Sequence, residues 1–262
     1  MPSSALHVAR TGLEAQDTRM RVIANNLANV GTTGFKRDRA NFATLAYQDA
    51  RVAGQQSSGE TAYATGLNLG TGVGIQSTTR VDTAGTLQTT GTALDLALDG
   101  EGYFQVALPG GQLGYTRAGN FSRSAEGQLV TAQGYVVQPP ITVPEGAGAI
   151  TISPDGTVSA LVPGTTEPSQ LGQMTIASFA NPSGLQSTGD NFLRETAASG
   201  AAQVGVPGDL GRGHIRQGFL EASNVNVVEE LVDMIECQRA YEINSKMIKA
   251  VDEMLQNANQ TL

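Results

Sequence analysis

The side chains that most often carry catalysis are few in this chain. Of its 262 residues only His7 and His214 are histidines, and neither has neighbours at the spacing of metal ligands. Asp95, Asp99 and Glu101 lie close together in the sequence, and paired carboxylates are the groups that cleave glycosidic bonds. Asp99 and Glu101 are each followed by glycine, however, which is typical of a turn. We therefore expect two surface histidines, a turn and no enzymatic activity.

Cofactor and nucleic-acid sites are also disfavoured. No glycine-rich phosphate loop follows a predicted strand, and Cys237 is the only cysteine, which excludes an intramolecular disulfide and a cysteine-rich metal site. We expect no cofactor and no metal. The formal net charge of −8 argues against binding of nucleic acid. The one basic cluster, Lys36, Arg37 and Arg39, follows the first predicted helix, where we expect a solvated helix exit.

Apolar residues recur at every seventh position at both ends of the chain. Near the start the first row is Leu6, Leu13, Met20 and Leu27, and a second row three places behind is Ala9, Gln16, Ile23 and Val30. Near the finish the row is Val227, Met234, Tyr241, Ile248 and Leu255. A repeat of seven predicts helices that pack as coiled coils. At ~1.5 Å per residue these helices span ~40 and ~50 Å, too long for one small core to cover, so each needs a helical partner.

The boundaries of both helices carry the expected signals. Asn226 followed by Glu229 predicts a capping box at the start of the second helix, and Gly31 and Gly34 are plausible stops for the first. Residues 84–218 are instead short runs of strand formers separated by glycine and turn dipeptides, which predicts an irregular antiparallel sheet or barrel. The sequence therefore predicts an α+β protein.

The segment 47–74 is of a third kind, rich in Gly, Gln, Ser, Thr and Ala. A structureless loop of this length is uncommon inside a compact domain, so we expect either an arm that lies on something else or a disordered linker. For an arm we expect main-chain hydrogen bonds to adjacent copies of the chain. The residues that we assign to this arm are Tyr47, Arg51, Gln55, Gln56 and Tyr63.

The N-terminus lacks the uninterrupted apolar run of a cleavable secretion signal, and no segment reads as a membrane span. Taken alone, these features would indicate a cytoplasmic protein.

Two sequence motifs, one near each end, resemble those of the axial proteins of the bacterial flagellum. The first is Val-Ile-Ala-Asn-Asn-Leu-Ala-Asn-Val at residues 22–30, with Thr-Gly-Phe-Lys at 33–36. The second begins with Ser-Asn-Val-Asn-Val at residues 223–227 and continues through Gln-Arg-Ala-Tyr-Glu at 238–242. The middle is similar too, at residues 102–106, 115–117 and 127–130. Within the family, the segment 47–73 resembles the insertion of distal rod subunits.

The resemblance implies an architecture and a function. Residues 1–35 and 221–262 would pair as an inner coiled-coil domain, residues 36–80 would form a linker and an extended arm, and residues 81–220 an outer β domain. Copies would polymerise into a rigid helical tube in the basal body that spans the periplasm, transmits torque from motor to hook and encloses an export channel. The implied partners are further copies, proximal rod proteins, the hook protein, the P- and L-ring proteins and, in transit, the type III export apparatus, which needs no cleaved signal peptide.

Assembly-interface residues follow from the rows and from the resemblance. They are Leu6, Leu13, Met20, Ile23, Asn25, Asn26, Leu27, Asn29, Val30, Val227, Leu231, Met234, Tyr241, Ile248 and Leu255. The three asparagines among them would bond between subunits or simply face solvent. Two alternatives stay open: a related proximal rod or hook subunit, and a secreted β-rich module, for example for cell-wall glycan, that its terminal helices oligomerise. The absence of Trp weakens the glycan alternative.

Overall fold

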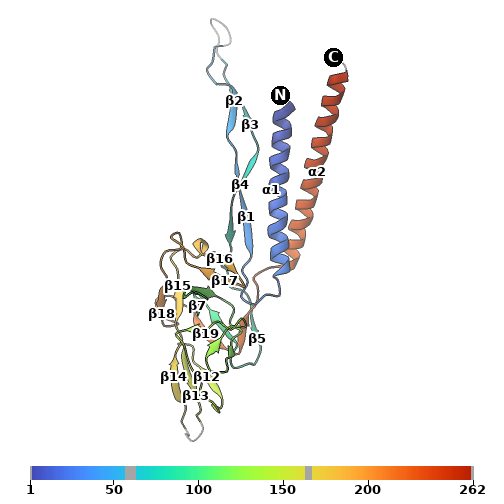
Figure 1. Cartoon of the computed structure of the whole chain (residues 1–262). Coiled ribbons are helices and arrows are strands. Elements are labelled where there is room, and N and C mark those ends of the chain that lie inside the picture. The colour runs from blue at the N-terminus through green and yellow to red at the C-terminus, as the bar shows by residue number, and fades with distance from the viewer. Residues whose placement is uncertain (1, 57–62, 163–166, 261–262) are drawn as a thin grey trace. The chain divides into compact units, whose positions relative to one another are not determined.

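The computed structural model describes residues 2–56, 63–162 and 167–260, and it confirms an α+β protein with one long helix at each end and many antiparallel strands between them (Figure 1). The chain divides into two compact units. The helical unit contains Met1–Leu27, Asp38–Thr79 and Asn226–Leu262, and the β unit contains Ala28–Arg37 and Arg80–Val225.

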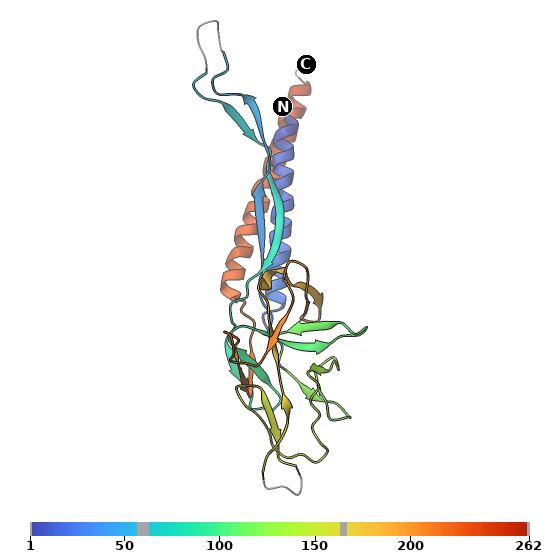
Figure 2. The same cartoon turned by 90° about the vertical axis from the view of Figure 1, so that its left-hand side faces the viewer.

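The helical unit holds two helices and two pairs of strands. Helix α1 spans Pro2–Ala28 and α2 spans Val227–Gln260, and Figures 1 and 2 show them side by side. Strand β1 (Asp38–Thr44) pairs with β4 (Val73–Arg80), and β2 (Tyr47–Arg51) pairs antiparallel with β3 (Leu67–Gly70). The Thr11 hydroxyl accepts a 3.4 Å hydrogen bond from the Val73 N–H, so the start of β4 contacts α1.

The start of α2 lies where the sequence predicts it, but the end of α1 does not. The Asn226 side chain accepts a hydrogen bond from the Val228 N–H at 3.1 Å, so Asn226 caps the start of α2, which is one half of the expected capping box. Helix α1 ends at Ala28, before either of the glycines that we expected to stop it. Gly34 has a left-handed φ of +68°, but it serves a turn inside the β unit. Helix α1 therefore ends earlier than the sequence indicated, and the residues that follow it belong to the β unit.

The β unit contains one seven-stranded antiparallel sheet and several smaller ones. The large sheet has the order β16-β17-β8-β7-β15-β18, with β11 also on β7. Its strands are β7 (Tyr103–Ala107), β8 (Leu113–Thr116), β11 (Val137–Gln138), β15 (Ile176–Ser178), β16 (Gln186–Gly189), β17 (Phe192–Arg194) and β18 (Gln203–Gly205). A three-stranded sheet is formed by β12 (Ile150–Ile152), β13 (Thr157–Ala160) and β14 (Ser169–Gln173). Two-stranded pairs join β6 (Leu96–Asp99) to β19 (His214–Gln217), β5 (Leu87–Thr89) to β20 (Phe219–Glu221), and β9 (Ser122–Arg123) to β10 (Leu129–Val130).

Both faces of the large sheet are buried. Alternate residues of β7 point to opposite faces, and accordingly Tyr103 belongs to one apolar cluster and Phe104 to another. Tyr115 meets Phe179 edge-on in the first cluster, with ring centroids 4.8 Å apart, and Phe104 meets Phe121 in the second at 5.1 Å. The two large apolar clusters of the described residues thus lie in the β unit.

Candidate assembly surfaces

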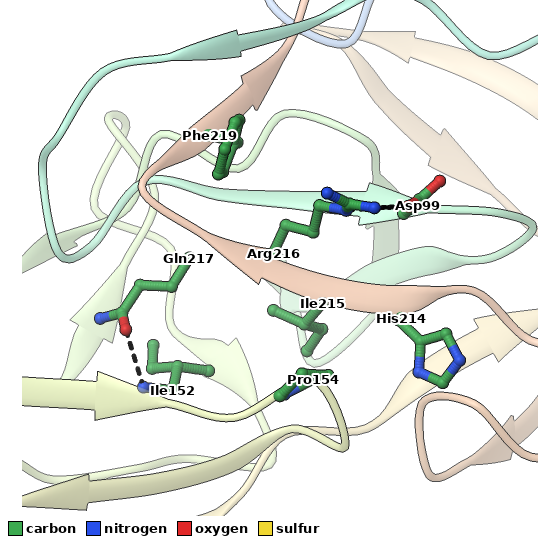
Figure 3. A pocket seen from close by; sticks show the side chains of 8 residues that line it. All are labelled: Asp99, Ile152, Pro154, His214, Ile215, Arg216, Gln217 and Phe219. Carbon is green, nitrogen blue, oxygen red and sulfur yellow. Dashed lines mark hydrogen bonds and ion pairs between the residues drawn. The ribbon is translucent and has the colours of Figure 1, made fainter.

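Two of the residues that first suggested chemistry, Asp99 and His214, line one pocket. A pocket of about 480 Å³ in the β unit brings Asp99 and His214 together, with Arg216, Gln217 and Phe219 on its wall (Figure 3). The Arg216 Nε donates to Asp99 Oδ2 at 2.8 Å. The Gln217 amide bonds the main chain of Ile150, Ile152 and Ala93. The carboxylate of this pocket is thus held in an ion pair, and its amide is hydrogen-bonded to the main chain.

The two histidines were expected to lie at the surface. His7 and His214 are both exposed. In the part of the chain that the structure describes, no group of three His, Cys, Asp or Glu side chains is arranged to hold a metal ion. Neither described helix has the length and apolarity that a membrane crossing requires.

The two rows of α1 differ in burial. Residues of the first row, Leu6, Leu13, Met20 and Leu27, are only half-buried, whereas Ala9 and Ile23 of the second row are buried. Of the other N-terminal interface candidates, Asn26 is buried, Asn29 is half-buried, and Asn25 and Val30 are exposed. Within the chain, the row that contains Ala9 and Ile23 is therefore packed more closely than the row that contains Leu6.

Helix α2 shows the same difference, and here the sequence analysis missed the buried row. Glu230, Cys237 and Val251 are buried, and the half-buried Asn244 completes a repeat of seven. The expected row lies three residues before each of these positions. Met234 and Ile248 are half-buried, Val227, Leu231 and Tyr241 are exposed, and the side chain of Leu255 is outside the described residues.

Contacts between α1 and α2 involve the buried row. The Cys237 thiol donates to the Gln16 carbonyl at 3.1 Å, and Arg19 forms a 2.8 Å ion pair with Asp233. A Cβ at Gly12 would lie 3.1 Å from the Asn244 amide nitrogen. Small residues thus allow the two helices to approach closely.

The Asn26 side chain forms its hydrogen bonds inside the helical unit. Its amide nitrogen donates to the Asp38 carbonyl at 2.9 Å and to Glu230 Oε1 at 3.2 Å, and its oxygen accepts from the Asp38 N–H at 2.9 Å. The side chain is 1% exposed, which excludes the alternative of solvent exposure. Asn26 therefore fixes the start of β1 against the first turn of α2.

Over residues 228–235, α2 is apolar and exposed on the side opposite the buried row. Val228 lies two residues before Glu230 and Ile235 two residues before Cys237, which places each about 200° around the helix from its buried neighbour. Val228 is 69% exposed, Ile235 51% and Ile243 61%; the other large apolar residues exposed on α2 are Val227, Leu231, Val232, Tyr241, Met247 and Met254. These exposed apolar residues form a second face of α2, which the single chain does not cover.

In the described parts of the segment 47–74, residues 47–56 and 63–74, two strands pair antiparallel. Strands β2 and β3 pair within the chain, from Tyr47 with Gly70 to Arg51 with Leu67, so one edge of each strand is hydrogen-bonded inside the chain. Gly54 and Gln55 extend the pairing to Tyr63, and the Arg51 guanidinium lies 4.0 Å from the Tyr63 ring centroid. All residues of β2 and β3 are exposed, as is Gln56, while Tyr63 is half-buried.

Lys36 is not part of a solvated helix exit. Its side chain is 4% exposed, and its Nζ lies 2.5 Å from Glu221 Oε1 and 2.7 Å from the Thr83 carbonyl. Burial lowers the pKa of Lys36 despite the neighbouring carboxylate. Burial alone would raise the pKa of Glu221, but the Arg117 charge, the Lys36 hydrogen bond and charge, and the Gly85 N–H outweigh it and lower that pKa.

Comparison with known proteins agrees with this arrangement. Three family models match: "Flagella basal body rod protein" over residues 6–36, "Flagellar hook protein FlgE/F/G D1 domain" over 97–160 and "Flagellar basal body rod FlgEFG protein C-terminal" over 216–261. The chain is 50% identical over 256 residues to the flagellar basal-body rod protein FlgG of Buchnera aphidicola subsp. Acyrthosiphon pisum, and 49% over 256 residues to that of subsp. Schizaphis graminum. It is 48% identical over 257 residues to FlgG of Caulobacter vibrioides, and each of the three comparisons covers 98% of both chains. The chain therefore belongs to the family of flagellar basal-body rod proteins and is a structural protein of the flagellum.

Proposed function

We propose that copies of this chain polymerise into the distal rod, a rigid helical tube that transmits torque from motor to hook and encloses the export channel. The full-length similarity to proteins named FlgG supports a rod subunit over the hook alternative. Matches at both terminal helices also disfavour an unrelated secreted module. Proximal rod proteins, the hook protein and the P- and L-ring proteins are its proposed partners, and the type III apparatus its route of export.

The two-faced helix α2 is the observation that carries this proposal. The row Glu230, Cys237 and Val251 is buried in the single chain, whereas Val228, Val232 and Ile235, on the opposite side of the first turns of α2, remain exposed. Pairing of α1 with α2 as a coiled coil would use the first face, and neighbouring subunits would cover the second. Contacts between unlike faces generate an open helical polymer where the rotation between subunits does not close, and this is the assembly proposed here.

Substitution at Ile235 tests the proposal. Ile235→Asp introduces a charge on the exposed apolar face without touching the buried row, so the purified chain should keep its helical circular dichroism while rod assembly and swimming fail. Gln238→Asp is the matched control, because it adds the same charge at an exposed polar position of the same helix. Normal basal bodies in the Ile235→Asp strain, counted by electron microscopy, would contradict the proposed interface.

A further inference from the structure

The chain passes between its two units four times, and three segments of the β unit carry these passages. The passages lie at residues 27/28, 37/38, 79/80 and 225/226, so the segments are 28–37, 80–86 and 221–225. Inside the β unit these segments bond one another through the main chain. The Gly34 N–H donates to the Glu221 carbonyl at 2.7 Å, the Val81 N–H to the Arg37 carbonyl at 2.9 Å and the Ala222 N–H to the Thr86 carbonyl at 2.9 Å.

Glu221 is the first side chain that joins all three segments. Its Oε1 lies 2.5 Å from Lys36 Nζ of the first segment and accepts from the Gly85 N–H of the second at 2.9 Å. Its Oε2 accepts from Arg117 Nη1 at 3.0 Å. The Glu221 side chain is 1% exposed, so this carboxylate is satisfied within the protein.

Asn224 is the second side chain that joins all three segments. Its Oδ1 accepts from the Arg37 N–H at 2.7 Å, and its Nδ2 donates to the Val81 carbonyl at 2.8 Å and the Thr83 carbonyl at 3.1 Å. The Asn224 N–H donates to the Phe35 carbonyl at 3.4 Å. One side chain of the third segment therefore holds the main chain of both others.

Close packing at Gly34 completes the arrangement. A Cβ at this position would lie 2.6 Å from the main-chain carbon of Arg117, and the residue has a left-handed φ of +68°. Glycine therefore lets the first segment lie directly on the strand end that carries Arg117. Glu221 and its two cations are all buried, and an apolar cluster of similar volume would stabilise the fold equally well. Unlike an apolar cluster, the charged groups form hydrogen bonds of defined geometry between the segments.

We infer that Glu221 and Asn224 are positioning residues of a clamp that joins every segment through which the chain leaves the β unit. Force carried along the covalent chain between the units passes through the four passages. A clamp that ties their segments together distributes this force over all of them instead of loading one strand at a time. This inference rests on the proposed function as a torque-transmitting shaft and names the residues that serve it.

Hydrogen exchange of the purified full chain tests the clamp without any rod. Glu221→Gln keeps the side-chain shape and removes the charge, so amides in 33–37, 81–86 and 222–224 should exchange together at least tenfold faster, while β7 around Phe104 keeps its wild-type rate. Glu145→Gln, an exposed site in the same unit, is the matched control. Faster exchange of the Gly85 peptide alone, no change, or uniform loosening of the whole unit would overturn the clamp.

Asn224→Ala provides a second, independent variant if Glu221→Gln fails to fold, and the same three segments should loosen. In cells, basal bodies that carry either variant should assemble but break at the rod under shear that leaves wild-type particles intact, as counted by electron microscopy. Equal shear resistance would overturn the force-sharing role. If the wild-type chain itself forms no rods, the proposed function fails, whereas the exchange result still decides whether the clamp exists.

Discussion

Asn26 and Glu230 bond each other side chain to side chain across the helical unit, with the amide nitrogen of Asn26 3.2 Å from Glu230 Oε1 and each residue 1% exposed. The same Asn26 amide group also accepts from and donates to the main chain of Asp38. A residue of α1 thus links the start of β1 to the first turn of α2. In a buried site such a link is costly to remove, because every partner then lacks a hydrogen bond.

Asn26→Leu should consequently destabilise the helical unit by about 3 kcal/mol, since it leaves the Glu230 carboxylate and the Asp38 main chain without this partner. Urea unfolding of the full chain, followed by circular dichroism at the helical band, measures the change. Ala24→Leu, at an exposed position of the same helix, should change the free energy of unfolding by less than about 1 kcal/mol. Equal effects of the two substitutions would show that the Asn26 bonds are not important for stability.

Glu221 gives a pH dependence whose sign follows from its environment. Its pKa is lowered in the folded state, so between the folded and unfolded pKa values the unfolded chain binds more protons. The stabilisation is therefore present above the unfolded value of about 4.3 and is lost as pH falls through the folded value. Arg117 and Lys36 are the cations that face the carboxylate.

At pH 7, Glu221→Gln should lower the free energy of unfolding by about 3–5 kcal/mol, because it leaves two buried cations without their counterion. As the pH is lowered below about 4, the wild type should lose stability faster than the variant and the two curves should converge. Urea titrations at a series of pH values measure both curves. A difference that stays constant down to pH 2 would show that folding does not lower the pKa of this carboxyl group.

Cys237 is expected to act only by packing. It is fully buried, its thiol donates to the Gln16 carbonyl, and burial raises its pKa, which makes it unreactive at neutral pH. Cys237→Ala should leave swimming largely intact at a cost of about 1 kcal/mol in stability. Cys237→Asp should abolish swimming, because an unpaired buried carboxylate costs about 3–5 kcal/mol. Loss of swimming in Cys237→Ala at normal protein level would reveal a redox role.

The repeat of seven predicted both helices, but on α2 it identified only the row that stays largely exposed. The buried row contains Glu230, Cys237 and Asn244, which a search for large apolar residues passes over. Small and polar residues pack there because their partners, such as Gln16 and Asn26, come from another helix. Local sequence cannot show those partners, so the pattern predicted the element and not its buried face.

Lys36 shows the same limit for the β unit. Three basic residues after a helix read as solvated, because nothing in the local sequence indicates a carboxylate 185 residues away. The turn dipeptides and strand formers, in contrast, predicted β7, β12 and β13 well, since their signals lie within the strands themselves. Local patterns thus predicted the elements, while long-range pairing decided which polar residues are buried.

The hairpin β2–β3 leads to the last prediction, which concerns stiffness. A two-stranded ribbon with all its residues exposed is marginally stable alone, and Leu67 and Leu69 lie on one face of it while Tyr47, on the other, packs over Gly70. We expect the leucine face to lie against neighbouring subunits in the rod and to prevent them from sliding.

The double substitution Leu67→Ser and Leu69→Ser should therefore leave the terminal helices, and with them polymerisation, intact, yet make isolated rods more flexible. Electron microscopy of these rods gives their persistence length, which should fall at least twofold. Asn68→Ser, on the opposite face of the same strand, is the matched control and should keep the wild-type value. Because pairing of β2 with β3 uses main-chain bonds, the substitutions remove the apolar contact without removing the hairpin. Rods as straight as the wild type in the double variant would show that this face contributes nothing to rigidity and that the hairpin is a passive connection.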